Sequence, residues 1–186
     1  MMQNISGFRQ SISFDDLLTD DEHIVIVDDD MMIREPLAEY LDESGFRVLE
    51  AQDAKELRHL MASKNVALIL LDIGLPDADG ASLIPELIAG HPGAAIIMLS
   101  GVADLHVAID CIRNGADDYL AKPVKFNEIL IVVKKVLEKR RLVFDNLKYQ
   151  DDLEQANFRF ELLHQLSLKI NSVHLTTSEL DKVLYA

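Results

Sequence analysis

The strongest constraint on the fold is the alternation of short, almost continuous apolar runs with segments of helical periodicity. A run that is apolar at nearly every position fits a strand covered on both faces, as in a parallel sheet. Strands that alternate with helices predict right-handed crossovers, with helices on both faces of the sheet. The predicted strands are residues 23–29, 46–52, 66–72, 94–100 and 117–123. The predicted helices are residues 32–43, 53–64, 80–89 and 104–114, and one that begins near Phe126. The sequence therefore predicts an α/β fold with a doubly wound parallel sheet.

Composition narrows the class of protein. With 18 Lys and Arg against 32 Asp and Glu, the net charge is −14, which argues against direct nucleic-acid binding, because phosphate contacts need clustered basic residues. The single cysteine, Cys111, excludes an intramolecular disulfide and is typical of a reducing compartment, so we expect a cytoplasmic protein. No apolar run approaches the ~20 residues that span a bilayer, and no signal-peptide pattern opens the chain, so no membrane association is expected.

Polar side chains stand where the predicted strands end. Asp28 and Asp29 end the first strand, Asp72 the third, Ser100 the fourth and Lys122 the fifth. Ligands of doubly wound sheets bind at the carboxyl ends of the strands, so these five side chains should converge in one crevice. Each has an ordinary explanation when taken alone, as a turn, a cap or a surface residue. Their joint placement at four strand ends predicts a functional site.

The residue types indicate phosphoryl chemistry. Crowded carboxylates repel, so a cation must hold them ionised, and hard oxygen ligands suit Mg²⁺, which is usually bound through one or two carboxylates and phosphate oxygens. An ionised Asp72 is a competent nucleophile that would form an acyl phosphate. The Lys122 ammonium would offset charge on the phosphoryl oxygens, and the Ser100 hydroxyl would hydrogen-bond one of them.

Four motifs together resemble the receiver domain of response regulators, the phosphoacceptor module of two-component signalling. They are "VDDDMMIR" (27–34), "LLDIGLPDADG" (70–80), "IIMLSG" (96–101) and "DDYLAKP" (117–123). The resemblance spans residues 23–140 and implies a flavodoxin-like (βα)5 sheet of strand order 2-1-3-4-5. It implies that a histidine kinase or a histidine phosphotransfer protein phosphorylates the chain, with Mg²⁺, or Mn²⁺ in its place, as the cofactor. The protein would be a signalling module that catalyses only its own phosphorylation and dephosphorylation.

The resemblance also assigns roles to single residues. Asp72 would be the phosphorylated residue, and Asp28, Asp29 and the backbone carbonyl of Gly74 would join it as metal ligands. Ser100 would be the switch hydroxyl, Tyr119 the aromatic residue whose rotamer reports activation, and Lys122 the phosphoryl contact, with a cis bond to the following proline. Glycine at position 74, and Gly101 after the switch hydroxyl, depart from the usual pattern. Both leave more room for water, so we expect an altered lifetime of the acyl phosphate.

Two other functions compete with this interpretation. A haloacid-dehalogenase-type phosphatase also uses an aspartyl nucleophile with Mg²⁺, and "DDD" at 28–30 loosely imitates its start, but no acidic pair follows the lysine at another predicted strand end. A degenerate receiver that serves only as a docking scaffold is the second alternative, although every expected polar position is filled.

The remainder of the chain is expected to link the receiver to an output. Residues 141–186 continue the helical pattern, and a heptad seam predicts a parallel dimeric coiled coil, against the alternative of a helix that folds back on its own domain. Thr176 and Glu179 have capping-box spacing, which predicts a new helix there, the start of an output domain truncated in this chain. Residues 1–22 are expected to form an N-terminal extension. The seam positions are Leu142, Asn146, Tyr149, Leu153, Ala156, Phe160, Leu163, Ser167 and Ile170.

Overall fold

The computed structural model describes the backbone of residues 17–101 and 105–184, and the side chains of residues 17–101 and 106–169. Residues 1–16 of the expected N-terminal extension thus lie outside the described residues. The elements are β1 (Glu22–Val27), α1 (Met31–Glu43), β2 (Val48–Ala51), α2 (Ala54–Ser63), β3 (Asn65–Asp72), α3 (Gly80–Gly90), β4 (Ala95–Ser100), α4 (Leu105–Arg113), β5 (Asp118–Ala121) and α5 (Phe126–Leu184). By contact density the chain divides into two units, Met1–Arg141 and Leu142–Ala186.

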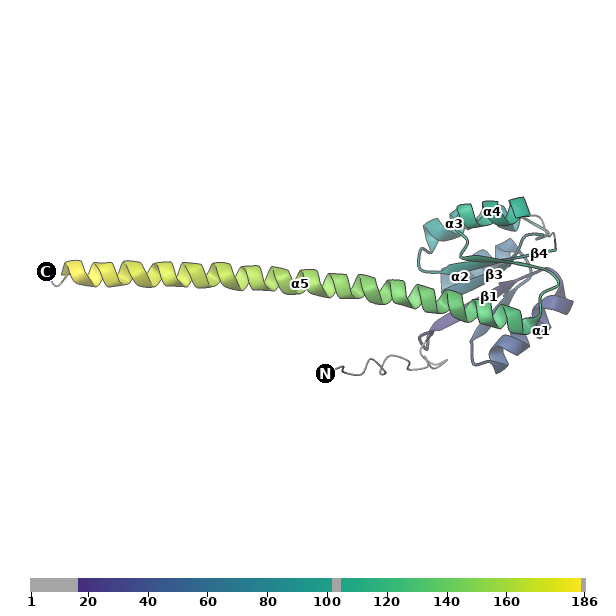
Figure 1. Cartoon of the computed structure of the whole chain (residues 1–186), viewed down its shortest axis with the longest axis horizontal. Coiled ribbons are helices and arrows are strands. Elements are labelled where there is room, and N and C mark those ends of the chain that lie inside the picture. Colours follow the sequence, from purple (N-terminus) through teal and green to yellow (C-terminus); the bar gives the residue numbers. More distant parts are fainter. Residues whose placement is uncertain (1–16, 102–104, 185–186) are drawn as a thin grey trace, which may run out of the picture. The chain divides into compact units, whose positions relative to one another are not determined.

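The first unit is built on one five-stranded sheet of order β2-β1-β3-β4-β5. Strands β1, β3 and β4 of this sheet are labelled in Figure 1. Every neighbouring pair of strands is parallel. The predicted flavodoxin-like sheet of order 2-1-3-4-5 is therefore confirmed. Since all five strands run the same way, all their carboxyl ends meet at one edge of the sheet.

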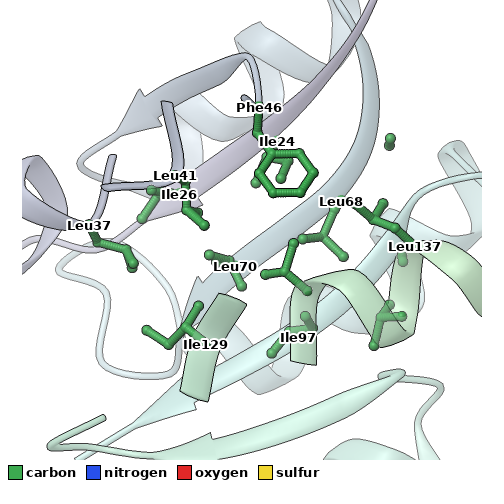
Figure 2. Close-up of a cluster of buried hydrophobic side chains, with 14 of the residues drawn as sticks. Ile24, Ile26, Leu37, Leu41, Phe46, Leu68, Leu70, Ile97, Ile129 and Leu137 are labelled. Atoms are coloured by element: carbon green, nitrogen blue, oxygen red, sulfur yellow. The ribbon is translucent and has the colours of Figure 1, made fainter. Parts of the chain in front are cut away.

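Side chains that alternate along the central strands fill two cores, one on each face of the sheet. Ile24 and Ile26 of β1 point into the core covered by α1 and by the first turns of α5, which Figure 2 shows. Val25 and Val27 point into the other core, which α2, α3 and α4 cover. Burial on both faces explains why the central strands read as continuous apolar runs rather than as an alternating pattern.

The loops after β1, β2 and β3 each end in an aspartate that caps the next helix. Asp30 accepts a hydrogen bond from the Met32 N–H, and Asp53 and Asp79 cap α2 and α3 in the same way. An aspartate at this position binds one of the N–H groups that the first helical turn leaves without a partner. Helices α1 and α2 therefore start within a few residues of the preceding strand, whereas the longer loop of residues 73–79 separates β3 from α3.

A buried ion pair closes the opposite edge of the sheet. Arg140 of α5 donates to Glu22 at the start of β1 (Nη2–Oε1 2.5 Å) and to the carbonyl of Gly93 before β4 (2.5 Å). Burial alone would raise the pKa of Glu22, but the Thr19 N–H and the Arg140 guanidinium outweigh it and hold that pKa below its ordinary value. Arg140 thus ties the last turn of α5 in the first unit to the start of β1 and to the loop before β4.

The second unit is one helix, the continuation of α5 through Leu184. The expectation that a new helix begins at Thr176 is wrong, because α5 runs through this position without interruption. The segment from Phe126 onward contains neither proline nor glycine, so a capping-box sequence alone does not end the helical backbone. Large apolar side chains are exposed on this unit, among them Leu153 (52%) and Phe160 (71%). Within the described residues, no helix is both long and apolar enough to cross a membrane.

Candidate functional site

Three aspartates converge at the carboxyl edge of the sheet. Asp28 and Asp29 follow β1, Asp72 ends β3, and each offers a carboxylate oxygen such that the three oxygens lie within 4.8 Å of one another. Asp28 and Asp72 are buried, whereas Asp29 is exposed. The adjacent positions of β1 and β3 in the sheet bring these residues together although they are more than forty positions apart in the sequence.

Lys122 supplies the positive charge of the site. Its Nζ lies 2.5 Å from Asp28 Oδ2 and 3.1 Å from Asp72 Oδ1. The position is set by the end of β5, where the Lys122 N–H donates to the Ser100 carbonyl at 2.6 Å. The bond between Lys122 and Pro123 is cis, as the sequence analysis expected. The sequence led us to expect this ammonium at a phosphoryl oxygen, and here it bridges two of the carboxylates.

The charged groups of the site, together with their burial, shift the pKa values of Asp72 and Lys122. Burial raises the pKa of Asp72, the Asp28 carboxylate raises it further, and the Lys122 ammonium only partly offsets both. Burial would lower the pKa of Lys122, but its hydrogen bonds and ion pairs with Asp28 and Asp72 raise it above the ordinary value. Three carboxylates and one ammonium leave a formal charge of −2. Hard oxygen donors with an excess of negative charge and one exposed member fit a divalent cation such as Mg²⁺.

The loop after Asp72 is closed by backbone contacts. Gly74 and Asp79 form an antiparallel bridge, and the Gly80 N–H donates to the Ile73 carbonyl at 2.9 Å. A Cβ at Gly80 would overlap the backbone carbonyl of Asp72, so this position requires glycine. A Cβ at Gly74 would lie 3.6 Å from Asp72 Oδ2, an ordinary contact. The side chain that Gly74 lacks would therefore lie beside the carboxylate.

The two expected switch residues lie on neighbouring strands. Ser100 is the last residue of β4 and is 2% exposed. Tyr119 of β5 pairs in register with Met98 of β4 and packs, half-buried, against the core that α2, α3 and α4 cover. Ser100 thus lies beside Lys122 at the edge of the sheet that holds the carboxylates. Tyr119 lies two residues before the end of β5, further from that edge.

Two groups near the site were not singled out from the sequence. Arg34 donates to the Asp28 carbonyl (2.5 Å) and to Glu50 (3.2 Å), and Asp77 accepts from the Ala54 N–H (2.9 Å) at the start of α2. Arg34 ends the motif at residues 27–34, but its acceptor is a backbone carbonyl, which no residue type in the sequence signals. Asp77 lies 23 positions from its donor, and no local spacing signals that contact.

Comparison with known proteins agrees with this geometry. A family model described as the response regulator receiver domain matches residues 24–134. The transcriptional regulatory protein GltR of Pseudomonas aeruginosa is 36% identical over 147 residues, which cover 77% of this chain and 60% of GltR. A CheY-like receiver domain protein of Methanospirillum hungatei is 32% identical with a TM-score of 0.62, over 64% of this chain and 96% of that one.

A second solved structure bears on the chemistry. It is a response regulator of Burkholderia pseudomallei with a phosphorylated aspartic acid, a calcium ion and citrate. It is 30% identical to this chain with a TM-score of 0.58, over 66% of this chain and 72% of that one. The chain spans between 27% and 37% of the length of three other curated relatives that it matches.

Proposed function

Because the chain belongs to the response regulator receiver domain family, we propose that Asp72 accepts a phosphoryl group from the phosphohistidine of a histidine kinase or a histidine phosphotransfer protein. The observation that carries the proposal is the cluster of three carboxylates with one lysine at the carboxyl edge of the sheet. We place the reaction in the cytoplasm. The family match leaves the dehalogenase-type phosphatase without support, whereas a docking scaffold that is never phosphorylated remains the alternative to test.

The proposed reaction is an in-line transfer. A carboxylate oxygen of Asp72 attacks phosphorus, and the bond from phosphorus to the histidine nitrogen breaks with its electron pair left on that nitrogen. A ring that is already protonated on its other nitrogen then leaves as neutral imidazole. Lys122, which already contacts the acceptor oxygen, would pair with the negative charge of the phosphoryl group, and Ser100 would donate a hydrogen bond to it. Asp72 is 7% exposed and lies at the carboxyl edge of the sheet, which is the side from which a partner's histidine would approach.

We propose that Asp28, Asp29, Asp72 and the Gly74 carbonyl hold Mg²⁺, which Mn²⁺ can replace. When bound, the dication offsets the charge of the carboxylates and of the incoming phosphoryl group. The geometry that supports this proposal is the 4.8 Å limit within which the three carboxylate oxygens lie, together with the excess of negative charge that Lys122 leaves uncompensated.

Phosphorylation tests the proposal directly. Incubation with acetyl phosphate and Mg²⁺ should add one base-labile phosphoryl group, which mass spectrometry should locate at Asp72. Asp72→Asn should abolish the modification, and EDTA should suppress it. Asp42→Asn, which changes an exposed aspartate of α1, is the matched control and should leave it intact. A phosphate at another residue, or an unmodified wild-type chain, would refute the phosphoacceptor role.

We also propose that the second unit forms a homodimer as a parallel coiled coil. The seam side chains described by the structure are exposed, and they include Leu153, Phe160 and Leu163 (66%). Exposed leucine and phenylalanine residues at heptad spacing are stabilised when a second copy covers them. In a parallel pair Asn146 would meet its own equivalent, which favours this register over shifted ones.

Sedimentation tests the dimer with a matched pair of variants. Leu153→Asp places a charge on the seam, whereas Leu162→Asp changes another exposed leucine (45%, against 52% for Leu153) outside the seam positions. At tens of micromolar we expect a dimer for the wild type and Leu162→Asp, and a monomer for Leu153→Asp. A chain truncated after Arg141 keeps the ion pair of Arg140 and should be monomeric. A truncated chain that still dimerises would place the interface on the first unit instead.

A further inference from the structure

Arg34 occupies a position that local helix energetics do not favour. It lies in the first turns of α1, four residues after the cap Asp30, where the positive end of the helix dipole disfavours a cation. Its side chain is nevertheless only 13% exposed. Its Nη1 donates to the backbone carbonyl of Asp28 at 2.5 Å, and its Nε donates to Glu50 Oε2 at 3.2 Å. The reason for a cation here therefore lies in its tertiary contacts.

The hydrogen bond from Arg34 completes the set of contacts that hold Asp28 in place. The Asp28 N–H donates to the Ala51 carbonyl at 3.2 Å, which continues the sheet pattern one residue past β1. Its Oδ1 accepts from the Asp30 N–H at 3.0 Å, and its Oδ2 contacts Lys122 Nζ. The carbonyl lies beyond the end of the strand, and Arg34 is its donor. Glu50 of β2 in turn orients the guanidinium of Arg34.

The hydrogen bond from Arg34 to the Asp28 carbonyl also constrains the next residue, Asp29. The carbonyl and the N–H of Asp29 belong to one planar peptide unit that also contains the Asp29 Cα, so fixing this carbonyl places that Cα and leaves the rotation about φ to set the direction of the Asp29 side chain. Asp29 is the exposed member of the three carboxylates and has no neighbouring strand to hold it. The direction of the Asp29 carboxylate therefore depends in part on the orientation of the peptide plane between Asp28 and Asp29.

We propose that Arg34 is a positioning residue for the divalent-cation site, which it serves by holding the peptide unit between Asp28 and Asp29. The inference rests on the cation site of the proposed function and adds a residue that touches none of the reacting atoms. Contacts of this kind orient the groups that bind a metal, and their loss commonly weakens metal binding by about 10–100-fold.

The test measures binding of Mn²⁺ alone to the full chain by electron paramagnetic resonance, because the protein contains no tryptophan to report binding by fluorescence. Arg34→Met keeps the apolar stem and removes both donors, and it should weaken binding about tenfold. Glu50→Leu removes the acceptor of the Arg34 Nε while both donors of Arg34 remain, and it should weaken binding, although by less than Arg34→Met. Arg58→Met is the matched control, because Arg58 forms an exposed pair with Glu86 (2.6 Å) away from the site.

The outcomes distinguish a positioning role of Arg34 from a purely structural role in holding α1 against β2. A role in tying α1 to β2 would lower the melting temperature of Arg34→Met without changing its affinity for Mn²⁺. Unchanged affinity in folded Arg34→Met therefore overturns the inference and leaves the proposed function intact. If Arg34→Met does not fold, Glu50→Leu decides: weaker binding supports the inference, and wild-type affinity overturns it. A wild-type chain that binds no Mn²⁺ overturns the cation site and the inference together.

Discussion

Replacing Asp72 by asparagine should stabilise the metal-free protein. The pKa of Asp72 is raised in the fold, which means that the folded state holds this proton more tightly than the unfolded chain does. The stabilisation from the protonated form is complete below the unfolded pKa and is lost as the pH rises through the folded pKa. At neutral pH the ionised Asp72 thus costs folding free energy, and the neutral asparagine of the same shape avoids that cost.

The size of the effect follows mainly from the burial of Asp72, which is the largest of the influences on its pKa. The hydrogen bond and the charge of Lys122 offset part of it, and the Asp28 carboxylate adds a smaller repulsion. A buried polar group that is incompletely compensated costs roughly 1–3 kcal/mol. We therefore expect a gain of about 1–3 kcal/mol, which in a chain of this length raises the melting temperature by roughly 3–8 °C.

Differential scanning calorimetry at pH 7, in EDTA and in 20 mM MgCl2, measures this gain and its dependence on metal. If the dissociation constant is about 1 mM, the wild type should gain about 2 kcal/mol from the added Mg²⁺. Asp72→Asn should gain less, because the site has lost one charged ligand. Glu39→Gln removes one exposed charge on α1 as a control for net charge. An asparagine variant that melts at or below the wild type in EDTA would refute the argument, since the attraction of Lys122 would then dominate.

Two further predictions concern the loop beside the acceptor and the opposite edge of the sheet. Gly74→Ala should leave the stability nearly unchanged, because its Cβ would make an ordinary contact with Asp72, and should slow hydrolysis of the acyl phosphate by crowding water, as decay of the phosphorylated form would show. Glu22 has a lowered pKa because the Thr19 N–H and Arg140 outweigh burial, so its contribution to stability is present above the unfolded pKa and lost as the pH falls through the folded pKa. Glu22→Gln should therefore lower the melting temperature at pH 7 and flatten its decline below about pH 4.5. An equally steep acid decline would contradict this role.

The positions of the site residues were predictable because strand ends are visible in the sequence. An apolar run that stops at a charged residue marks both the end of a buried strand and the residue delivered to the sheet edge, which is why Asp72 and Lys122 were placed correctly. The sequence did not reveal that Lys122 bridges Asp28 and Asp72, because the pairing depends on the spatial order of three strands.

Contacts to the backbone were the hardest to predict. Arg34 binds a carbonyl, and every residue has a carbonyl, so no pattern of residue types distinguishes its acceptor. Gly80 could be recognised as a loop residue, but its close approach to the Asp72 carbonyl appears only in the fold. The prediction that a new helix begins at Thr176 was wrong for a different reason. The local cap signal was present, but the preceding residues contain no helix breaker, and the backbone stays helical.

The core beneath the site indicates how phosphorylation would reach α5. Leu99 of β4, directly before Ser100, lies in the same buried cluster as Ile129 and Val133 from the first turns of α5. Because packed cores rearrange between discrete states rather than deform continuously, a shift of the end of β4 toward a phosphoryl group would require these turns to repack. Ile129→Ala would leave a cavity at this contact without touching the site. We therefore expect Ile129→Ala to be phosphorylated at the wild-type rate while hydrogen exchange in the first turns of α5 no longer responds to the phosphate. A response equal to that of the wild type would show that the signal leaves the site by another route.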